Sequence, residues 1–122
     1  MPLIGRRVLV VDDDEDTVEL ERFVLAKARA EVRAVRSVRE AMAVVESFIP
    51  DVVIADLMMP EEDGFTLVQD LRRRGLHPTS LALTGRAEAS MAERAREAGF
   101  ARTMTKPIDP EDLVRTIVRA IA

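Results

Sequence analysis

Short apolar runs rich in β-branched residues alternate along the whole chain with longer amphipathic stretches, and this alternation constrains the fold more than any other feature. A short strand followed each time by a helix-length segment predicts a parallel sheet with helices packed on its faces. The central runs are apolar at successive positions, which is typical of strands buried on both faces. The expected strands cover residues 8–11, 31–35, 52–55, 81–83 and 102–105.

Helical patterns occupy the stretches that follow these runs, and capping residues mark the start of two of them. Ser37 followed by Glu40 forms a capping box, and Asp109 followed by Pro110 is a second signal for a helix N-terminus. Gly75 lies where one helix would end. The expected helices cover residues 17–28, 38–48, 65–74, 89–98 and 110–121.

The number of these units and the chain length together predict one fold class. With 122 residues the chain suits a single domain. Five βα units in one domain fit an α/β, flavodoxin-like (βα)5 doubly wound fold, in which a five-stranded parallel sheet of order 2-1-3-4-5 carries helices on both faces. In the first expected helix, the spacing of Leu20, Phe23, Val24 and Lys27 predicts a stripe that faces the sheet.

Composition excludes several classes of protein. The 18 Lys and Arg residues against 22 Asp and Glu residues give a net charge of −4, which argues against a direct nucleic-acid partner or an anionic membrane. Every apolar run is far shorter than the ~20 residues of a membrane span, and the lack of cysteine excludes a disulfide scaffold or thiol nucleophile. We therefore expect a cytoplasmic protein without a membrane or nucleic-acid partner.

Polar side chains follow the expected strands at their carboxyl ends, the edge at which open α/β sheets bind ligands. Clustered carboxylates repel one another and need either a cation or a raised pKa. A hard divalent ion is the simpler answer, and Mg²⁺ prefers oxygen ligands. The candidate residues are Asp12, Asp13 and Asp14 after the first run, Asp56 after the third, Thr84 after the fourth and Lys106 after the fifth.

These residue types indicate phosphoryl-transfer chemistry. Asp56 stands alone after its strand, so it is the candidate nucleophile toward phosphorus, because aspartate can form an acyl phosphate. The acidic residues at 12–14 are placed to hold the metal. Thr84 and Lys106 would supply a hydroxyl group and an ammonium group to the phosphoryl oxygens.

Four motifs in this order and spacing resemble the receiver domain of two-component response regulators, of the chemotaxis-receiver type, over essentially the whole chain. They are VLVVDD at 8–13, DLMMPEEDG at 56–64, LALTG at 81–85 and TKP at 105–107. The resemblance implies that a sensor histidine kinase or a histidine phosphotransfer domain donates a phosphoryl group in a Mg²⁺-dependent reaction. It also implies self-catalysed phosphotransfer and autodephosphorylation without turnover of an external substrate, and a changed surface that signals to a downstream protein.

The resemblance assigns roles residue by residue. Asp56 is implied as the phosphoacceptor, Asp13 as a direct Mg²⁺ ligand and Asp12 as a ligand mainly through water. The backbone carbonyl of Met58 is implied as a further metal ligand. Thr84 is implied as the switch hydroxyl and Lys106 as the phosphoryl-binding cation, with a cis bond to Pro107. Asp14 receives no ligand role, and Pro60, Asp63 and Gly64 resemble the family's turn into the third helix.

The chain departs from the family pattern near the site. Receivers often carry an aromatic residue where this chain has Thr103, so the usual coupling of that ring to the switch hydroxyl is not expected in its common form. Met58 and Arg86 match family positions that flank the phosphoryl group. Met58 offers neither an acid nor an amide to hold an attacking water, and we expect a comparatively long-lived acyl phosphate.

Two other functions fit parts of the pattern. A degenerate receiver would act only as a protein-binding module, or as an assembly domain inside a larger hybrid protein. A haloacid-dehalogenase-like phosphatase would use Asp12 and Asp14, but that assignment leaves Asp56 without a role. Residues 1–122 are expected to form a single receiver domain with no output domain.

Overall fold

The computed structural model describes residues 3–59, 64–85 and 89–122, and these form one five-stranded parallel sheet with helices on both faces. The strands are β1 (Arg7–Val11), β2 (Glu31–Val35), β3 (Val52–Asp56), β4 (Thr79–Thr84) and β5 (Arg102–Thr105). The helices are α1 (Glu15–Lys27), α2 (Val38–Val44), α3 (Gly64–Arg73), α4 (Ala89–Ala98) and α5 (Pro110–Ile121).

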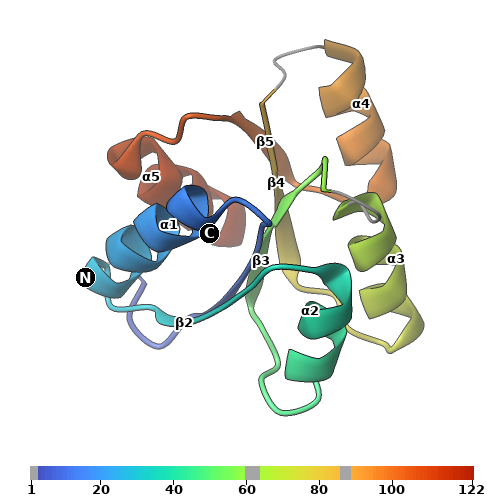
Figure 1. The fold of residues 1–122 in the computed structure, drawn as a ribbon, viewed down its shortest axis with the longest axis horizontal. Helices are drawn as coiled ribbons and strands as arrows, with labels where there is room; N and C mark the ends of the chain where they lie inside the picture. Colours follow the sequence, from blue (N-terminus) through green and yellow to red (C-terminus); the bar gives the residue numbers. More distant parts are fainter. Residues whose placement is uncertain (1–2, 60–63, 86–88) are drawn as a thin grey trace.

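The strand order is β2-β1-β3-β4-β5, and every neighbouring pair is parallel, which confirms the expected winding. Helices α1 and α5 cover one face of the sheet, while α2, α3 and α4 cover the other (Figure 1). Because β1 connects to β2 on one side and pairs with β3 on the other, the chain reverses its winding direction between β1 and β3. Ligand sites in such sheets lie at the carboxyl ends beside that reversal.

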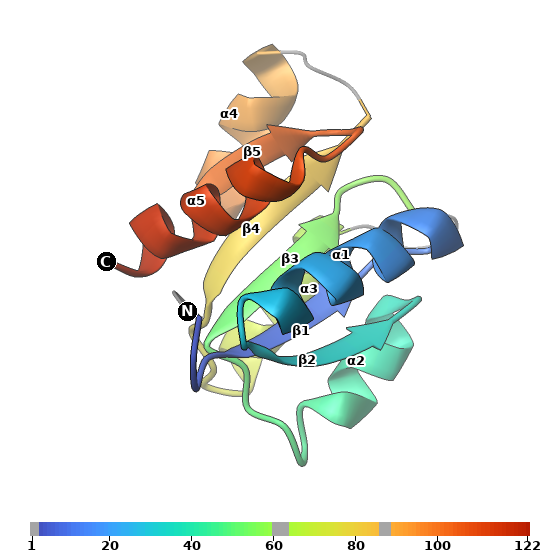
Figure 2. The ribbon, with the colours of Figure 1, turned by 90° about the vertical axis from the view of Figure 1, so that its left-hand side faces the viewer.

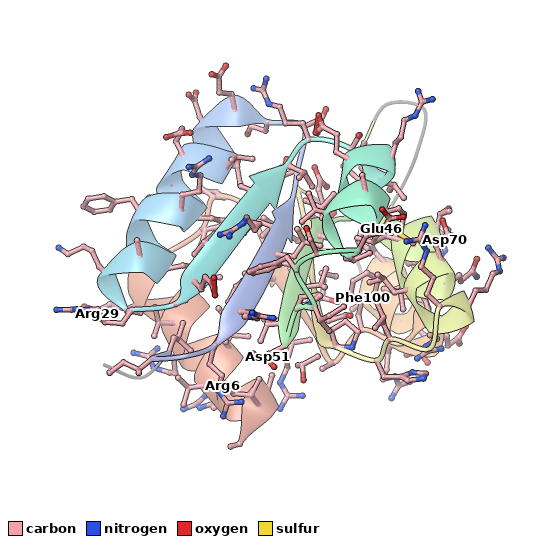
Figure 3. All side chains as sticks on the ribbon, turned by 90° about the horizontal axis from the view of Figure 1, so that it is seen from below. Arg6, Arg29, Glu46, Asp51, Asp70 and Phe100 are labelled. Atoms are coloured by element: carbon pink, nitrogen blue, oxygen red, sulfur yellow. The ribbon has the colours of Figure 1, made fainter. Side chains whose placement is uncertain are left out.

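Two apolar layers hold the sheet between the helices. Alternate strand residues point to opposite faces, so Val8 and Val10 face one layer while Leu9 and Val11 face the other. We call the first the α1–α5 layer; its buried members are Leu3, Val8, Val10, Val18, Val24, Leu25, Ala28, Val52, Ile54, Leu81, Leu83, Ile108, Leu113 and Ile117. In the opposite layer, Phe100 lies beside α3 (Figure 3). Its ring meets the Phe65 ring edge to face, with 6.2 Å between centroids.

Local capping agrees with the sequence signals. Ser37 Oγ accepts a hydrogen bond from the Glu40 amide at 3.1 Å, and Asp109 accepts bonds from the amides of Glu111 and Asp112. Gly75 has a φ of 78°, the left-handed conformation that favours glycine just after a helix. The second helix ends at Val44 rather than residue 48, because residues 45–47 form turns that bring Phe48 into the core.

The expected core stripe of the first helix is wrong at Leu20, Phe23 and Lys27 and confirmed only at Val24. Phe23 is 62% exposed and Leu20 is 37% exposed, while Lys27 also faces solvent, with its ammonium group 5.2 Å from the centroid of the Phe23 ring. The helix instead buries Val18, Glu21, Val24 and Leu25 against the sheet. The difference is a rotation of the buried face, and it brings an acidic residue into the apolar layer. No helix among the described residues has the length and apolar content needed to cross a membrane.

Candidate functional site

The carboxyl ends of β1, β3, β4 and β5 bring the candidate side chains together at one edge of the sheet. Asp56 is the last residue of β3, and Thr84 is the last residue of β4. Asp12 directly follows β1 and Lys106 directly follows β5. In Figure 2 this edge lies toward the upper right, where the first turn of α1 begins.

An acidic cluster forms the centre of the site. Oxygen atoms of Asp12, Asp13 and Asp56 all lie within 4.8 Å of one another, the only such group of possible metal ligands in the described ranges. Asp12 and Asp56 are buried, at 1% and 4% exposed, whereas Asp13 is open to solvent. Two carboxylates of the cluster are thus buried, and the third, Asp13, is accessible from solvent.

Backbone hydrogen bonds orient the two buried carboxylates. Asp12 Oδ1 accepts from the Asp14 amide at 2.9 Å, and Asp56 Oδ1 accepts from the Met58 amide at 2.9 Å. The Asp12 amide in turn donates to the carbonyl of Val35 at the end of β2. These contacts hold both side chains at fixed positions on the strand ends, as a preorganised site requires.

Lys106 joins the two buried acids. Its ammonium nitrogen lies 3.1 Å from Asp56 Oδ2, and 3.2 and 3.0 Å from the two oxygens of Asp12. Burial alone would lower the pKa of Lys106, but its hydrogen bonds with Asp12 and Asp56 outweigh burial and raise the pKa. Burial raises the pKa of Asp12, against the opposing effect of the bonds from Asp14 and Lys106.

The strand ends on the far side of the site are linked through the main chain. The Lys106 amide donates a 2.8 Å hydrogen bond to the Thr84 carbonyl oxygen, so β4 and β5 hold these two residues side by side. Thr84 is 1% exposed. The bond between Lys106 and Pro107 is cis, as expected.

Other predicted residues have different structural roles or lie outside the described ranges. Asp14 caps α1 by accepting from the Asp16 amide and the Thr17 hydroxyl, and the Thr17 bond lowers its pKa. Thr103 lies half-buried in β5 opposite Ala82. Gly64 starts α3, and a Cβ there would lie 2.7 Å from the Asp56 carbonyl oxygen. The expectations on Pro60, Asp63 and Arg86 fall outside the described residues.

Glu21 is a buried acid that the sequence pattern did not predict. It is fully buried on α1, which packs on the face of the sheet toward which Val10 and Ile54 point. Its spacing from Val18 and Leu25 was the available signal, because the three positions form one helical stripe.

A family model described as the response regulator receiver domain matches residues 8–118. An uncharacterised 14.6 kDa protein of Leptolyngbya boryana is 38% identical over 90% of this chain and 86% of its own length. The transcriptional regulatory protein PhoP of Bacillus subtilis, which controls alkaline phosphatase synthesis, is 32% identical over 97% of this chain but only 49% of its own length.

Solved structures give the same result. The chemotaxis response regulator CheY4 of Vibrio cholerae superposes with a TM-score of 0.88 at 29% identity, covering 94% of this chain and 98% of that one. A response regulator receiver domain protein of Clostridium thermocellum superposes with a TM-score of 0.84 at 27% identity, covering 95% and 94%.

Proposed function

Because the chain belongs to the family of response regulator receiver domains, we propose that it accepts a phosphoryl group on Asp56 in a Mg²⁺-dependent reaction. The observation that carries the proposal is the meeting of three carboxylates with one ammonium group at the carboxyl edge of the sheet. We further propose that residues 1–122 act as one receiver domain that signals to a protein partner.

The donor set suits a hard divalent cation. Carboxylate oxygens are the ligands Mg²⁺ prefers, and the cluster offers three of them within 4.8 Å. Asp12, Asp13 and Asp56 would hold the ion, and the main chain of Met58 adjoins the cluster through its amide. When bound, Mg²⁺ offsets the negative charge of the pocket and of the incoming phosphoryl oxygens. A Met58 carbonyl ligand stays a prediction.

Asp56 acts as the nucleophile. A carboxylate oxygen of Asp56 forms a bond to phosphorus while the bond from phosphorus to the histidine nitrogen of the donor breaks, and that nitrogen keeps the electron pair. Lys106 is already 3.1 Å from Asp56 Oδ2 and balances the charge that builds up on the transferring group. Sensor histidine kinases and histidine phosphotransfer domains are the donors that the family membership supports.

Phosphorylation changes the charge that Thr84 and Lys106 face. The carboxylate at −1 becomes an acyl phosphate near −2, which adds strong acceptor oxygens beside both residues. The Thr84 hydroxyl and the Lys106 ammonium then bind the phosphoryl oxygens, and the Lys106 amide bond to the Thr84 carbonyl links the movement of β4 to that of β5. A two-state shift of this edge supplies the signal.

A degenerate receiver that only binds partners is the competing function. The five positions to which the resemblance gives a side-chain role all hold chemically competent residues, which favours phosphoryl acceptance; they are Asp12, Asp13, Asp56, Thr84 and Lys106. The haloacid-dehalogenase-like function loses support, because Asp56 lies inside the acidic cluster rather than apart from it.

Intact-mass measurement after incubation with acetyl phosphate and Mg²⁺ tests the proposal. We expect one added phosphoryl group on the wild type and none on Asp56→Asn or after chelation of the metal. Asp70→Asn, which changes a carboxylate of α3 that pairs with Arg73 and is not part of the cluster, should be modified like the wild type. An unmodified wild type under all conditions, or equal modification of Asp56→Asn, would overturn the proposal.

A further inference from the structure

Glu21 places a carboxyl group in the apolar α1–α5 layer, where the neighbouring side chains pack without polar contacts to it. Its side chain is 0% exposed, and neither of its oxygens has a hydrogen-bond partner in the described part of the chain. It projects from α1 into the α1–α5 layer, between Val18 and Val24 on the buried face of the helix. A charged form at this position would lose its hydration without gaining a partner.

Glu21 enters the layer toward which the two buried acids of the acceptor site (Asp12, Asp56 and Lys106) point, because strand alternation turns Asp12 and Asp56 to the same face as Val10 and Ile54. The charged groups of this site act on Glu21. They come from the ends of three strands: Asp12 after β1, Asp56 in β3 and Lys106 after β5. No hydrogen bond or ion pair joins Glu21 to any of them, so the groups interact through space.

The other elements packed against α1 contribute apolar groups. Helix α5 offers Leu113 and Ile117, and β2 offers Val32 and Ala34. The charged residues of α5 and β2 are exposed to solvent; they are Glu31, Arg33, Glu111, Asp112, Arg115 and Arg119. Arg7, at the start of β1, is exposed as well. Among the described residues, the acceptor site, which we also call the acceptor pocket, is therefore the one source of buried charge that Glu21 faces.

Burial keeps Glu21 neutral at rest. It raises the pKa of this carboxyl group to about 9, with the nearby negative charge of Asp12 and Asp56 adding to the rise and Lys106 opposing it. The apolar surroundings and the negative charge of Asp12 and Asp56 thus keep Glu21 protonated.

We propose that Glu21 is a proton-linked regulator of the acceptor pocket, releasing its proton when a divalent cation enters and retaining it when the pocket is negative. The inference rests on the proposed function, because it takes Mg²⁺ as the cation. The step balances simply: the O–H bond of the Glu21 acid breaks, its electrons stay on the carboxylate, and the proton passes to solvent.

Linkage makes this coupling reciprocal. If cation binding favours loss of the proton, then a higher pH favours cation binding by the same factor. One fully coupled proton makes the affinity rise tenfold per pH unit. We expect the Mg²⁺ affinity of the wild type to rise at least threefold from pH 6.5 to pH 7.5 beyond any rise in Glu21→Gln.

Nuclear magnetic resonance of ¹³C-labelled protein tests the coupling without use of activity. Mg²⁺ is titrated at pH 6.5, 7.0 and 7.5 into the wild type, Glu21→Gln and Glu19→Gln, and affinity is read from amide shifts. Glu19 lies exposed on the same helix, so Glu19→Gln is the matched control and should keep the wild-type dependence. In the wild type, the side-chain carboxyl signal that is absent from Glu21→Gln reports the proton directly and should move toward the ionised shift as Mg²⁺ is added.

The outcomes separate the two proposals. Mg²⁺ binding with the same pH dependence in Glu21→Gln as in the wild type, or a Glu21 carboxyl signal that Mg²⁺ leaves unchanged, would overturn the proton linkage and leave the proposed function standing. Absence of Mg²⁺ binding in the wild type would overturn the proposed function and this inference with it. If Glu21→Gln does not fold, the wild-type Glu21 carboxyl signal, assigned through its bonds to the Glu21 backbone, alone decides.

Discussion

Replacing Glu21 by glutamine should make the folded protein more stable at neutral pH, in the absence of any metal. The folded state raises the pKa of Glu21 from 4.5 to about 9, so between these values the folded protein binds a proton that the unfolded chain has lost. The free energy of unfolding therefore falls as pH rises through this window, because the unfolded state binds fewer protons. Glutamine resembles the neutral acid in shape and does not titrate.

The magnitude follows from the width of the window. Each pH unit costs about 1.4 kcal/mol, so the stability lost is about 3 kcal/mol by pH 7 and about 6 kcal/mol by pH 9. Typical domains are stable by roughly 5–15 kcal/mol, so a loss of this size is easily measured. Glu21→Gln and the wild type should have similar stability near pH 4.5 and diverge steadily above it.

Urea denaturation followed by far-ultraviolet circular dichroism is the suitable assay, because the chain has no Trp or Tyr for intrinsic fluorescence. Glu19→Gln provides the control for loss of a negative charge on α1 and should follow the wild type at every pH. Asp12, whose pKa burial also raises, titrates in all three proteins, so it largely cancels from the difference. Parallel curves for the wild type and Glu21→Gln from pH 5 to pH 8 would refute the reasoning.

Three further predictions concern the site itself. Lys106→Met should lower stability at pH 7 by about 3 kcal/mol without metal, because it leaves Asp12 and Asp56 buried without their cation, and added Mg²⁺ should restore part of the loss in urea titrations. Gly64→Ala should cost about 1–3 kcal/mol and slow phosphoryl acceptance, since its Cβ would lie 2.7 Å from the Asp56 carbonyl oxygen; normal rates in intact-mass time courses would count against this. The acyl phosphate should persist for minutes or longer in phosphate-release assays, because Met58 cannot hold an attacking water, and Met58→Asn should shorten its lifetime.

The alternation of short apolar runs with amphipathic stretches was enough to predict the fold. Strand positions depend on runs such as 52–55, which are apolar at every residue and can only be buried between two helix layers. Helix ends depended on capping chemistry that is local in sequence, and Ser37 and Asp109 cap as expected. The end of α2 was missed because the burial of Phe48, a tertiary contact, overrides the continuing helical pattern.

The acidic cluster could be predicted because parallel strands end at one edge, so residues that follow separate strands must meet there. Asp12 and Asp56 share a face with Val10 and Ile54 by strand alternation, which places them toward α1 and α5. Glu21 could not be found in this way. Periodicity in α1 allows two overlapping stripes, and the one with Leu20 and Phe23 is more apolar, so the choice depends on how the helix rotates against the sheet.

The rotation of α1 buries Glu21 in place of Leu20 and Phe23. The buried acids are therefore of two kinds, those with a charged partner and one without. Asp12 and Asp56 are buried with Lys106 as their partner, so removing one acid changes both charge balance and chemistry. Glu21 has no partner, so its burial is a cost that packing does not require. A residue that destabilises the resting fold without touching the acceptor can act on the site only through its charge, and loss of the proton is the one event that changes that charge. Stability and cation affinity should therefore respond to the same substitution with opposite dependence on pH: the wild type loses stability as pH rises and gains affinity for the cation.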